Sequence, residues 1–235
     1  NTQIGSDYGG IYTKQNQWHH YVFMHETDGS SDADIVTLWI DGHRVFRVTG
    51  LDRISFDNNS FAFGTEAVGS NFGSLGNYFE GYLHDVKFTK AKLYTSTNET
   101  ISVPGSRSTA HASLNIFHGF HNPFLDPRFT IGGTPFPVPY IPYDREVYAP
   151  DKHGGSFYIN NNAAGNIETT DKATNEIQLG TGNFTIELWY RPEGATSFWE
   201  AILSKRYATT GGWRLYKDTS NGYLKWYRSS TNSLT

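Results

Sequence analysis

The chain has 235 residues, with 19 Lys and Arg against 23 Asp and Glu, a formal net charge of -4 and no cysteine. The lack of cysteine excludes disulfides, thiolate zinc sites and cysteine nucleophiles. There is no long basic run and no apolar stretch near the roughly 20 residues of a membrane-spanning helix, so we expect neither nucleic-acid binding nor membrane insertion. Because the sequence starts at Asn1 without an initiator methionine or a signal peptide, we expect a mature or partial chain.

Short runs of β-branched and aromatic residues, separated by Gly, Asn, Asp and Ser, recur along the chain and predict β-strands. In chain order these runs cover residues 18–26, 35–40, 43–48, 82–88, 114–120, 157–160, 184–191, 213–217 and 223–227. Asp41-Gly42 and Asn221-Gly222 separate neighbouring runs, and such dipeptides favour the type I′ turn of a hairpin. Apolar residues rarely recur at helical spacing. The pattern therefore predicts an all-β chain, an antiparallel β-sandwich or jelly roll.

The stretch from Pro104 to Gly155 holds most of the nine prolines of the chain. Proline cannot donate a hydrogen bond to a β-ladder, so this stretch is expected to be a connector or an edge covering. We predict that residues 123–142 are largely strand-free yet ordered, lying across the sandwich through four aromatic side chains. These side chains are Phe124, Phe129, Phe136 and Tyr140.

Three groups of motifs belong together by their spacing. They are GGSFYI (154–159) with TGNFTIELW (181–189), ILSK (202–205) with GWRL (212–215), and WHHYV (18–22) with LWIDG (38–42) and FEGYLHDVKF (79–88). Together they resemble the laminin-G-like, concanavalin-A-like jelly roll that recurs as tandem modules in phage structural proteins and bacterial surface proteins. The resemblance implies an antiparallel β-sandwich. It implies little about function, because lectins, glucanases, pentraxins and plain scaffolds share this fold.

The order of these motifs is reversed relative to the family, so the half-modules stand in permuted order. Three segments are expected: 1–103 as the second half of a sandwich, 104–153 as a Pro-rich connector with one strand near 114–120, and 154–235 as the first half. A window cut from a tandem array and a circular permutant both explain this order, and we favour the window. Each half alone would leave open sheet edges. We therefore expect one sandwich built from both halves, with Trp18 and Trp189 in one core.

The acidic residues argue against catalysis. Glycosidases place two carboxylates roughly 5 to 9 Å apart, and the glucanases of this fold carry acids at alternate positions of one strand face. Glu187 is the single acid in its strand, and the odd spacing of Glu80 and Asp85 predicts opposite faces. We expect these acids at solvent-facing strand positions. The sequence thus predicts a protein that is not an enzyme.

The best candidate for a metal site is one loop. Asp28, Asp32 and Asp34 place three carboxylates within seven residues, and hard oxygens of this kind could converge on Ca²⁺. A solvated hairpin loop without metal is the interpretation we favour. No other cofactor is expected.

Four aromatic residues in Gly- and Thr-rich loops are the candidate ligand-binding residues, because aromatic rings stack on sugar rings and loops commonly carry binding sites. They are Tyr8, Tyr12, Trp199 and Tyr207. Alternatively, these rings pin the loops or bury against a neighbouring module. By contrast, Trp18, Trp39, Trp189 and Trp213 are expected in the core.

The sequence therefore predicts a non-catalytic adhesion, glycan-binding or assembly module of an extracellular or virion-surface protein. Its expected partners are a glycan or neighbouring protein subunits, including further copies of the same module. The alternative is a purely structural fibre, sheath or capsid-decoration protein without a glycan ligand. A glycoside hydrolase is disfavoured, since paired carboxylates are missing.

Overall fold

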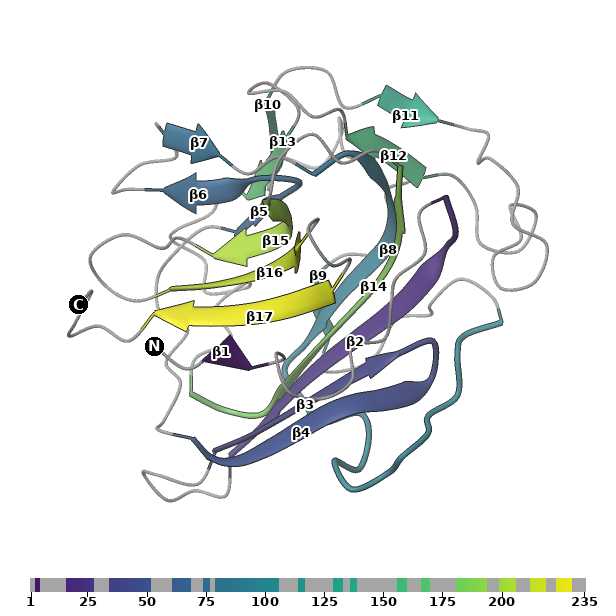
Figure 1. The fold of residues 1–235 in the computed structure, drawn as a ribbon, viewed down its shortest axis with the longest axis vertical. Helices are drawn as coiled ribbons and strands as arrows, with labels where there is room; N and C mark the ends of the chain where they lie inside the picture. The colour runs from purple at the N-terminus through teal and green to yellow at the C-terminus, as the bar shows by residue number, and fades with distance from the viewer. Residues whose placement is uncertain are drawn as a thin grey trace.

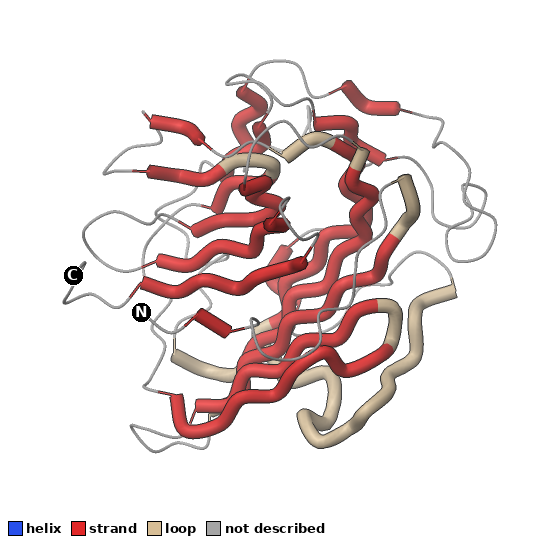
Figure 2. The backbone as a smooth tube through the Cα atoms, in the orientation of Figure 1, coloured by secondary structure: helices blue, strands red, loops and turns tan. Residues whose placement is uncertain are grey.

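The structure is a computed structural model, and it describes part of the chain. The described residues are 3–4, 16–27, 34–51, 61–68, 74–76, 79–105, 114–116, 129–132, 136–138, 156–159, 166–169, 181–193, 199–205, 212–218 and 223–229. All regular secondary structure in these ranges is β-strand, and no helix among them is long and apolar enough to cross a membrane (Figure 2).

Two antiparallel sheets face each other and make the body of the molecule (Figure 1). The seven-stranded sheet runs β1 (Gln3–Ile4), β17 (Tyr223–Ser229), β16 (Gly212–Asp218), β15 (Trp199–Lys205), β5 (Phe61–Phe63), β13 (Asn166–Thr169), β10 (Phe129–Gly132). The eight-stranded sheet runs β11 (Phe136–Val138), β12 (Ser156–Ile159), β8 (Gly81–Thr89), β14 (Phe184–Pro192), β2 (His19–Glu26), β3 (Asp34–Ile40), β4 (His43–Leu51), with β9 (Leu114–Ile116) beside β8. A separate ribbon joins β6 (Glu66–Val68) to β7 (Ser74–Gly76). This all-β, antiparallel sandwich confirms the predicted fold class.

Both sheets combine strands from the two ends of the chain. In the eight-stranded sheet, β14 lies between β8 and β2 and pairs antiparallel with each. In the seven-stranded sheet, β5 lies between β13 and β15, and the short β1 pairs with β17. The two halves therefore close within one chain, as expected. The boundaries at residues 103 and 154 stay a prediction.

Most strands expected from sequence recur with boundaries shifted by one or two residues. β4 runs three residues further than expected, and of the expected run 114–120 the structure describes Leu114–Ile116 as strand. The Pro-rich segment differs. Residues 123–142 were expected to be largely strand-free, whereas β10 and β11 lie within them. Each is the last strand of its sheet, and Pro137 lies in β11 opposite Phe157. An outermost strand needs ladder bonds on one side only, so it tolerates a proline. The packing of Phe124, Phe129, Phe136 and Tyr140 lies outside the described residues.

The β3–β4 hairpin has the predicted tight turn. Asp41 and Gly42 both adopt positive φ, 50° and 79°, as a type I′ turn requires. A Cβ at Gly42 would lie 2.7 Å from the carbonyl oxygen of Ile101, so the close approach of a second segment also demands glycine.

The interior between the sheets is filled by alternate residues of the facing strands. Tyr21, Leu38 and Leu188 of the eight-stranded sheet meet Phe63 and Leu215 of the seven-stranded sheet in one large apolar cluster. Burying each such side chain contributes about 1.5–3 kcal/mol relative to exposure. The opposite face of the eight-stranded sheet carries two further clusters, and this second face holds the candidate site.

Candidate functional site

A segment that follows β8 covers part of the outer face of the eight-stranded sheet, the face turned away from the seven-stranded sheet. We call residues 90–105 the strap; it is the loop beside β3 and β4 at the lower right of Figure 1. Its backbone bonds the β3–β4 hairpin, since the Arg44 N–H donates to the Glu99 carbonyl (2.8 Å) and the Ile101 N–H to the Gly42 carbonyl (2.8 Å). The strap is thus fixed to the sheet by main-chain hydrogen bonds.

Side chains of the sheet also hold the strap. The Trp39 indole N–H donates to the Asn98 carbonyl at 3.0 Å. The Thr185 hydroxyl donates to the Ala91 carbonyl at 2.8 Å and accepts from the Leu93 N–H at 3.2 Å. Under the strap, Val22, Met24 and Trp39 form a buried apolar cluster against Tyr94 and Ile101. The outer face is therefore a second, smaller core.

Strand β14 runs through the centre of this face and presents every second side chain to it. Its interior positions are Phe184, Ile186, Leu188 and Tyr190. Its outward positions, by the strand period of two, are Thr185, Glu187, Trp189 and Arg191. A single carboxylate therefore stands among the four outward positions.

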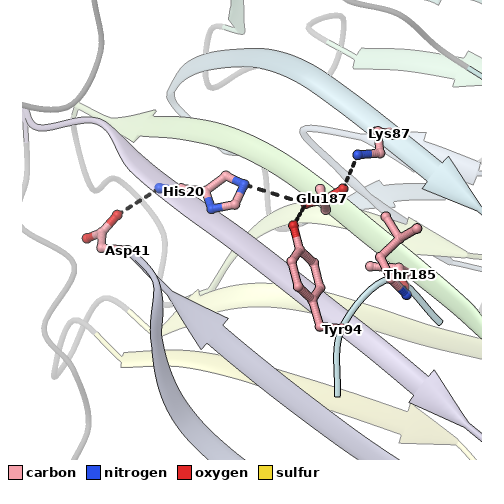
Figure 3. A network of polar contacts seen from close by, with 7 residues as sticks. His20, Asp41, Lys87, Tyr94, Thr185 and Glu187 are labelled. Carbon is pink, nitrogen blue, oxygen red and sulfur yellow. Dashed lines mark hydrogen bonds and ion pairs between the residues drawn. The ribbon is translucent and has the colours of Figure 1, made fainter. Parts of the chain in front are cut away.

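Glu187 is the centre of a polar network on the outer face (Figure 3). The Tyr94 hydroxyl donates to Glu187 Oε1 at 2.5 Å, and Lys87 Nζ pairs with Oε2. The Glu187 side chain is only 4% exposed. We expected Glu187 and Asp85 at solvent-facing positions, and that expectation is wrong, since both are buried. For Glu187 the reason is the strap, whose Tyr94 closes over the carboxylate.

His20 lies on the same face beside Glu187, with 3.9 Å between Nε2 and Oε1, too long for a hydrogen bond. Its ring packs on Trp189 at a centroid distance of 5.0 Å. Burial lowers the pKa of His20 to about 4, against the opposing charges of Glu187 and Asp41. The imidazole is therefore neutral near pH 7 and acts as a packing group beside the carboxylate.

Tyr94 and Lys87 hold the Glu187 carboxylate in place. Lys87 neutralises its charge, and burial together with the adjacent carboxylate raises the pKa of Tyr94, so the phenol keeps its proton and continues to donate. A general acid or base must exchange a proton with a bound substrate. A carboxylate sealed by a phenol, an ammonium and the strap holds the strap in place instead.

His19 and His20 are neighbours in β2, so their side chains point to opposite faces of the sheet, as strand alternation predicts. His19 points to the interior face, where its ring lies 5.6 Å from that of Tyr190, and its Nδ1 bonds Asp41 Oδ2 at 2.7 Å. Asp41 also accepts from the His20 N–H at 2.8 Å, through its other oxygen. The turn aspartate thus ties β2 to the β3–β4 hairpin.

The seven-stranded sheet carries a second buried charge pair. Glu200 and Lys217 are opposite each other on β15 and β16, with 3.6 Å between Nζ and Oε2. Lys217 is two residues from Leu215, an interior residue, so the pair faces into the sandwich. Burial raises the pKa of Glu200 to about 7, opposed by Lys217.

The predicted calcium residues are not brought together in the described structure. Asp28 and Asp32 lie outside the described residues. Asp34 is fully buried as the first residue of β3, and His25 Nε2 bonds its Oδ2 at 2.9 Å. In the described ranges no group of three His, Asp or Glu side chains could hold a metal ion. Calcium binding in the loop stays a prediction.

Of the predicted ligand-binding residues, Tyr8, Tyr12 and Tyr207 lie outside the described residues. Trp199 was expected in a loop, but it is the first residue of β15 and pairs with Asp218 of β16. The apolar run that follows it explains the difference, since Ala201, Ile202 and Leu203 continue the same strand into the core. Sequence analysis also missed Tyr94. The only hint in the sequence was a single aromatic residue in a segment without a strand pattern.

The comparison with known protein families agrees with this architecture. Residues 7–96 match a laminin G family model described as the concanavalin A-like lectin/glucanases superfamily. No curated protein and no solved structure gives a significant match. The matched segment includes β2, β3, β4 and β8, and β14 joins it to the later part of the chain by pairing with β2 and β8.

Proposed function

Residues 7–96 belong to the concanavalin A-like lectin/glucanase superfamily, and from this premise we propose that the chain is a non-catalytic binding module. It binds a glycan or a neighbouring protein subunit and serves adhesion or assembly on the outside of a cell or virion. The fold alone does not separate lectins from hydrolases, so the proposal depends on the site.

One observation carries the proposal: the single outward carboxylate of β14, Glu187, is bonded by Tyr94 and Lys87 beneath the strap. Glycoside hydrolysis uses two carboxyl groups that reach the scissile bond from either side. On β14 the other outward positions are a threonine, a tryptophan and an arginine. This arrangement supports binding or scaffolding in place of acid–base chemistry.

The experiment pairs a binding assay with a hydrolysis assay on the full chain. We expect specific hits on a glycan array, or self-assembly in light scattering, and no release of reducing ends from β-glucans, xylan or chitin. Glu187→Gln should leave binding unchanged after its folding has been checked by circular dichroism, because the residue is buried. Hydrolysis that Glu187→Gln abolishes would overturn the proposal.

The two forms of the proposal give different results. A glycan-binding module gives array hits that variants of the candidate aromatic residues remove, with Trp199→Ala as the first variant to test. A purely structural protein gives a blank array and a defined oligomer. A blank array with a monomer contradicts both forms.

A further inference from the structure

Two tyrosine rings lie side by side on the outer face of the eight-stranded sheet, beyond the strap. Tyr82 of β8 and Tyr158 of β12 are paired in register, and their ring centroids are 5.0 Å apart at an interplanar angle of 47°. Both side chains are half-buried. On its other side Tyr82 rests on the buried Trp18, with ring centroids 6.3 Å apart. The Trp18 contact fixes the Tyr82 ring, and both tyrosine rings keep part of their surface exposed.

Charged groups surround these rings. Arg191 stands opposite Tyr82 on β14, with its Cζ 5.5 Å from the ring centroid, and its Nη1 bonds Glu193 Oε1 at 2.7 Å. The Tyr158 hydroxyl donates to Glu80 Oε1 at 3.3 Å. The two glutamates come from adjacent strand ends, where the Glu193 N–H donates to the Glu80 carbonyl at 3.0 Å. We call Glu80, Tyr82, Tyr158, Arg191 and Glu193 the tyrosine patch.

The patch has more hydrogen-bonding capacity than its own contacts use. Arg191 is only 8% exposed, and its Nε has no hydrogen-bond partner among the described residues. In the contacts between described side chains, Glu80 and Glu193 each use one carboxylate oxygen. Because the Arg191 Nε is buried, the groups open to a ligand are the second carboxylate oxygens of the half-buried Glu80 and Glu193, which can accept from hydroxyl groups.

We propose that the tyrosine patch binds one sugar residue of a neutral glycan, an inference that rests on the glycan-binding form of the proposed function. A sugar ring presents C–H groups that pack on tyrosine rings. Its hydroxyls donate to carboxylates. Two carboxylates and one guanidinium give the patch an excess negative charge, which repels uronate and sialyl groups. The specificity is therefore for uncharged sugars.

The test uses the full chain and isothermal titration with two sets of soluble oligosaccharides. The neutral set is maltotriose, cellotriose, xylotriose and N-acetylchitotriose; the acidic set is trigalacturonate and 3′-sialyllactose. We expect binding to at least one neutral ligand and none to the acidic ones. Tyr158→Ala should weaken that binding by about tenfold or more, whereas Tyr158→Phe, which keeps the ring, should change it less.

Further variants separate this inference from the proposed function. Glu193→Gln, at a half-buried position, should narrow the preference for neutral over acidic ligand and serves as a second variant if Tyr158→Ala does not fold. Binding that survives Tyr158→Ala but is lost in Trp199→Ala would overturn the tyrosine patch and keep the proposed function. Acidic ligands bound as tightly as neutral ones would also overturn it. Absence of binding to every ligand would overturn the patch, and a defined oligomer would then leave only the structural form of the proposed function.

Discussion

Removing one hydroxyl group, by Tyr94→Phe, should loosen the strap from the sheet. The ring keeps its contacts, since it packs on Trp39 at a centroid distance of 5.9 Å, so no cavity forms. The loss is the 2.5 Å hydrogen bond to Glu187 Oε1. His20, 3.9 Å away and neutral, is too far to replace it. A hydrogen bond to a charged group contributes about 1.5–3 kcal/mol, so we expect a loss of about 2 kcal/mol.

The assay is urea and thermal unfolding of the wild type, Tyr94→Phe, Glu187→Gln and the double variant. A loss of about 2 kcal/mol lowers the Tm by about 4–8 °C in a chain of this size. The double-mutant cycle should give a coupling of about 1 kcal/mol or more. Tyr158→Phe is the matched control, because its hydroxyl bond is 3.3 Å long and half exposed. If Tyr94→Phe unfolds like this control, the hydrogen bond from Tyr94 to Glu187 adds nothing measurable to the free energy of unfolding, and our argument fails.

Three further predictions concern stability. Burial raises the pKa of Glu200 to about 7, so the folded chain keeps a proton that the unfolded chain releases above about pH 4.5. The free energy of unfolding therefore falls by up to about 3 kcal/mol as the pH rises from about 4.5 to about 7. Glu200→Gln should remove this decline in urea melts, and an unchanged decline would contradict the prediction. The pH dependence that His20 contributes runs the other way. Its pKa of about 4 lies below the unfolded value of 6.5, so the free energy of unfolding falls as the pH drops from 6.5 towards 4. His20→Gln should reduce that loss in the same melts. Gly42→Ala should lower the free energy of unfolding by about 1–3 kcal/mol in thermal melts, because φ is +79° and the new Cβ would meet the Ile101 carbonyl. Gly105→Ala is the control and should be neutral, because no atom lies near its Cβ position. Equal melting temperatures for the two variants would refute the close approach at Gly42.

The strands of the sandwich were predictable because their signal is local. In the runs around Tyr21, Trp39 and Leu188, apolar and polar residues alternate or β-branched residues are dense, and the dipeptide Asp41-Gly42 by itself predicts a hairpin turn. Short strands such as β5 and β13 were missed, since three or four residues carry too little pattern. β10 and β11 were missed because the prolines of the surrounding segment predicted few strands, and the sequence does not reveal that both strands lie at sheet edges.

The candidate site was less predictable, because its chemistry depends on a segment without periodicity. Nothing near Tyr94 in the sequence indicates that it meets Glu187, which lies 93 residues later. Alternation placed Glu187 on the outer face correctly, but an outer face is exposed only if nothing covers it. The tyrosine patch was missed for a related reason, since Tyr82 and Tyr158 meet only when β12 joins β8.

The central position of β14 has a consequence for synthesis of the chain. Strands β2, β3, β4 and β8 leave the ribosome first, yet β2 and β8 do not pair with each other, because β14 fills the place between them. About 100 further residues must be made before that strand emerges, roughly 5–20 s at ordinary elongation rates. During this interval the nascent chain holds two unpaired sheet edges and an incomplete core. A chaperone that binds exposed strands would therefore act on the nascent chain during this interval. A chain truncated before residue 184 should be insoluble, because its sheet edges stay unpaired.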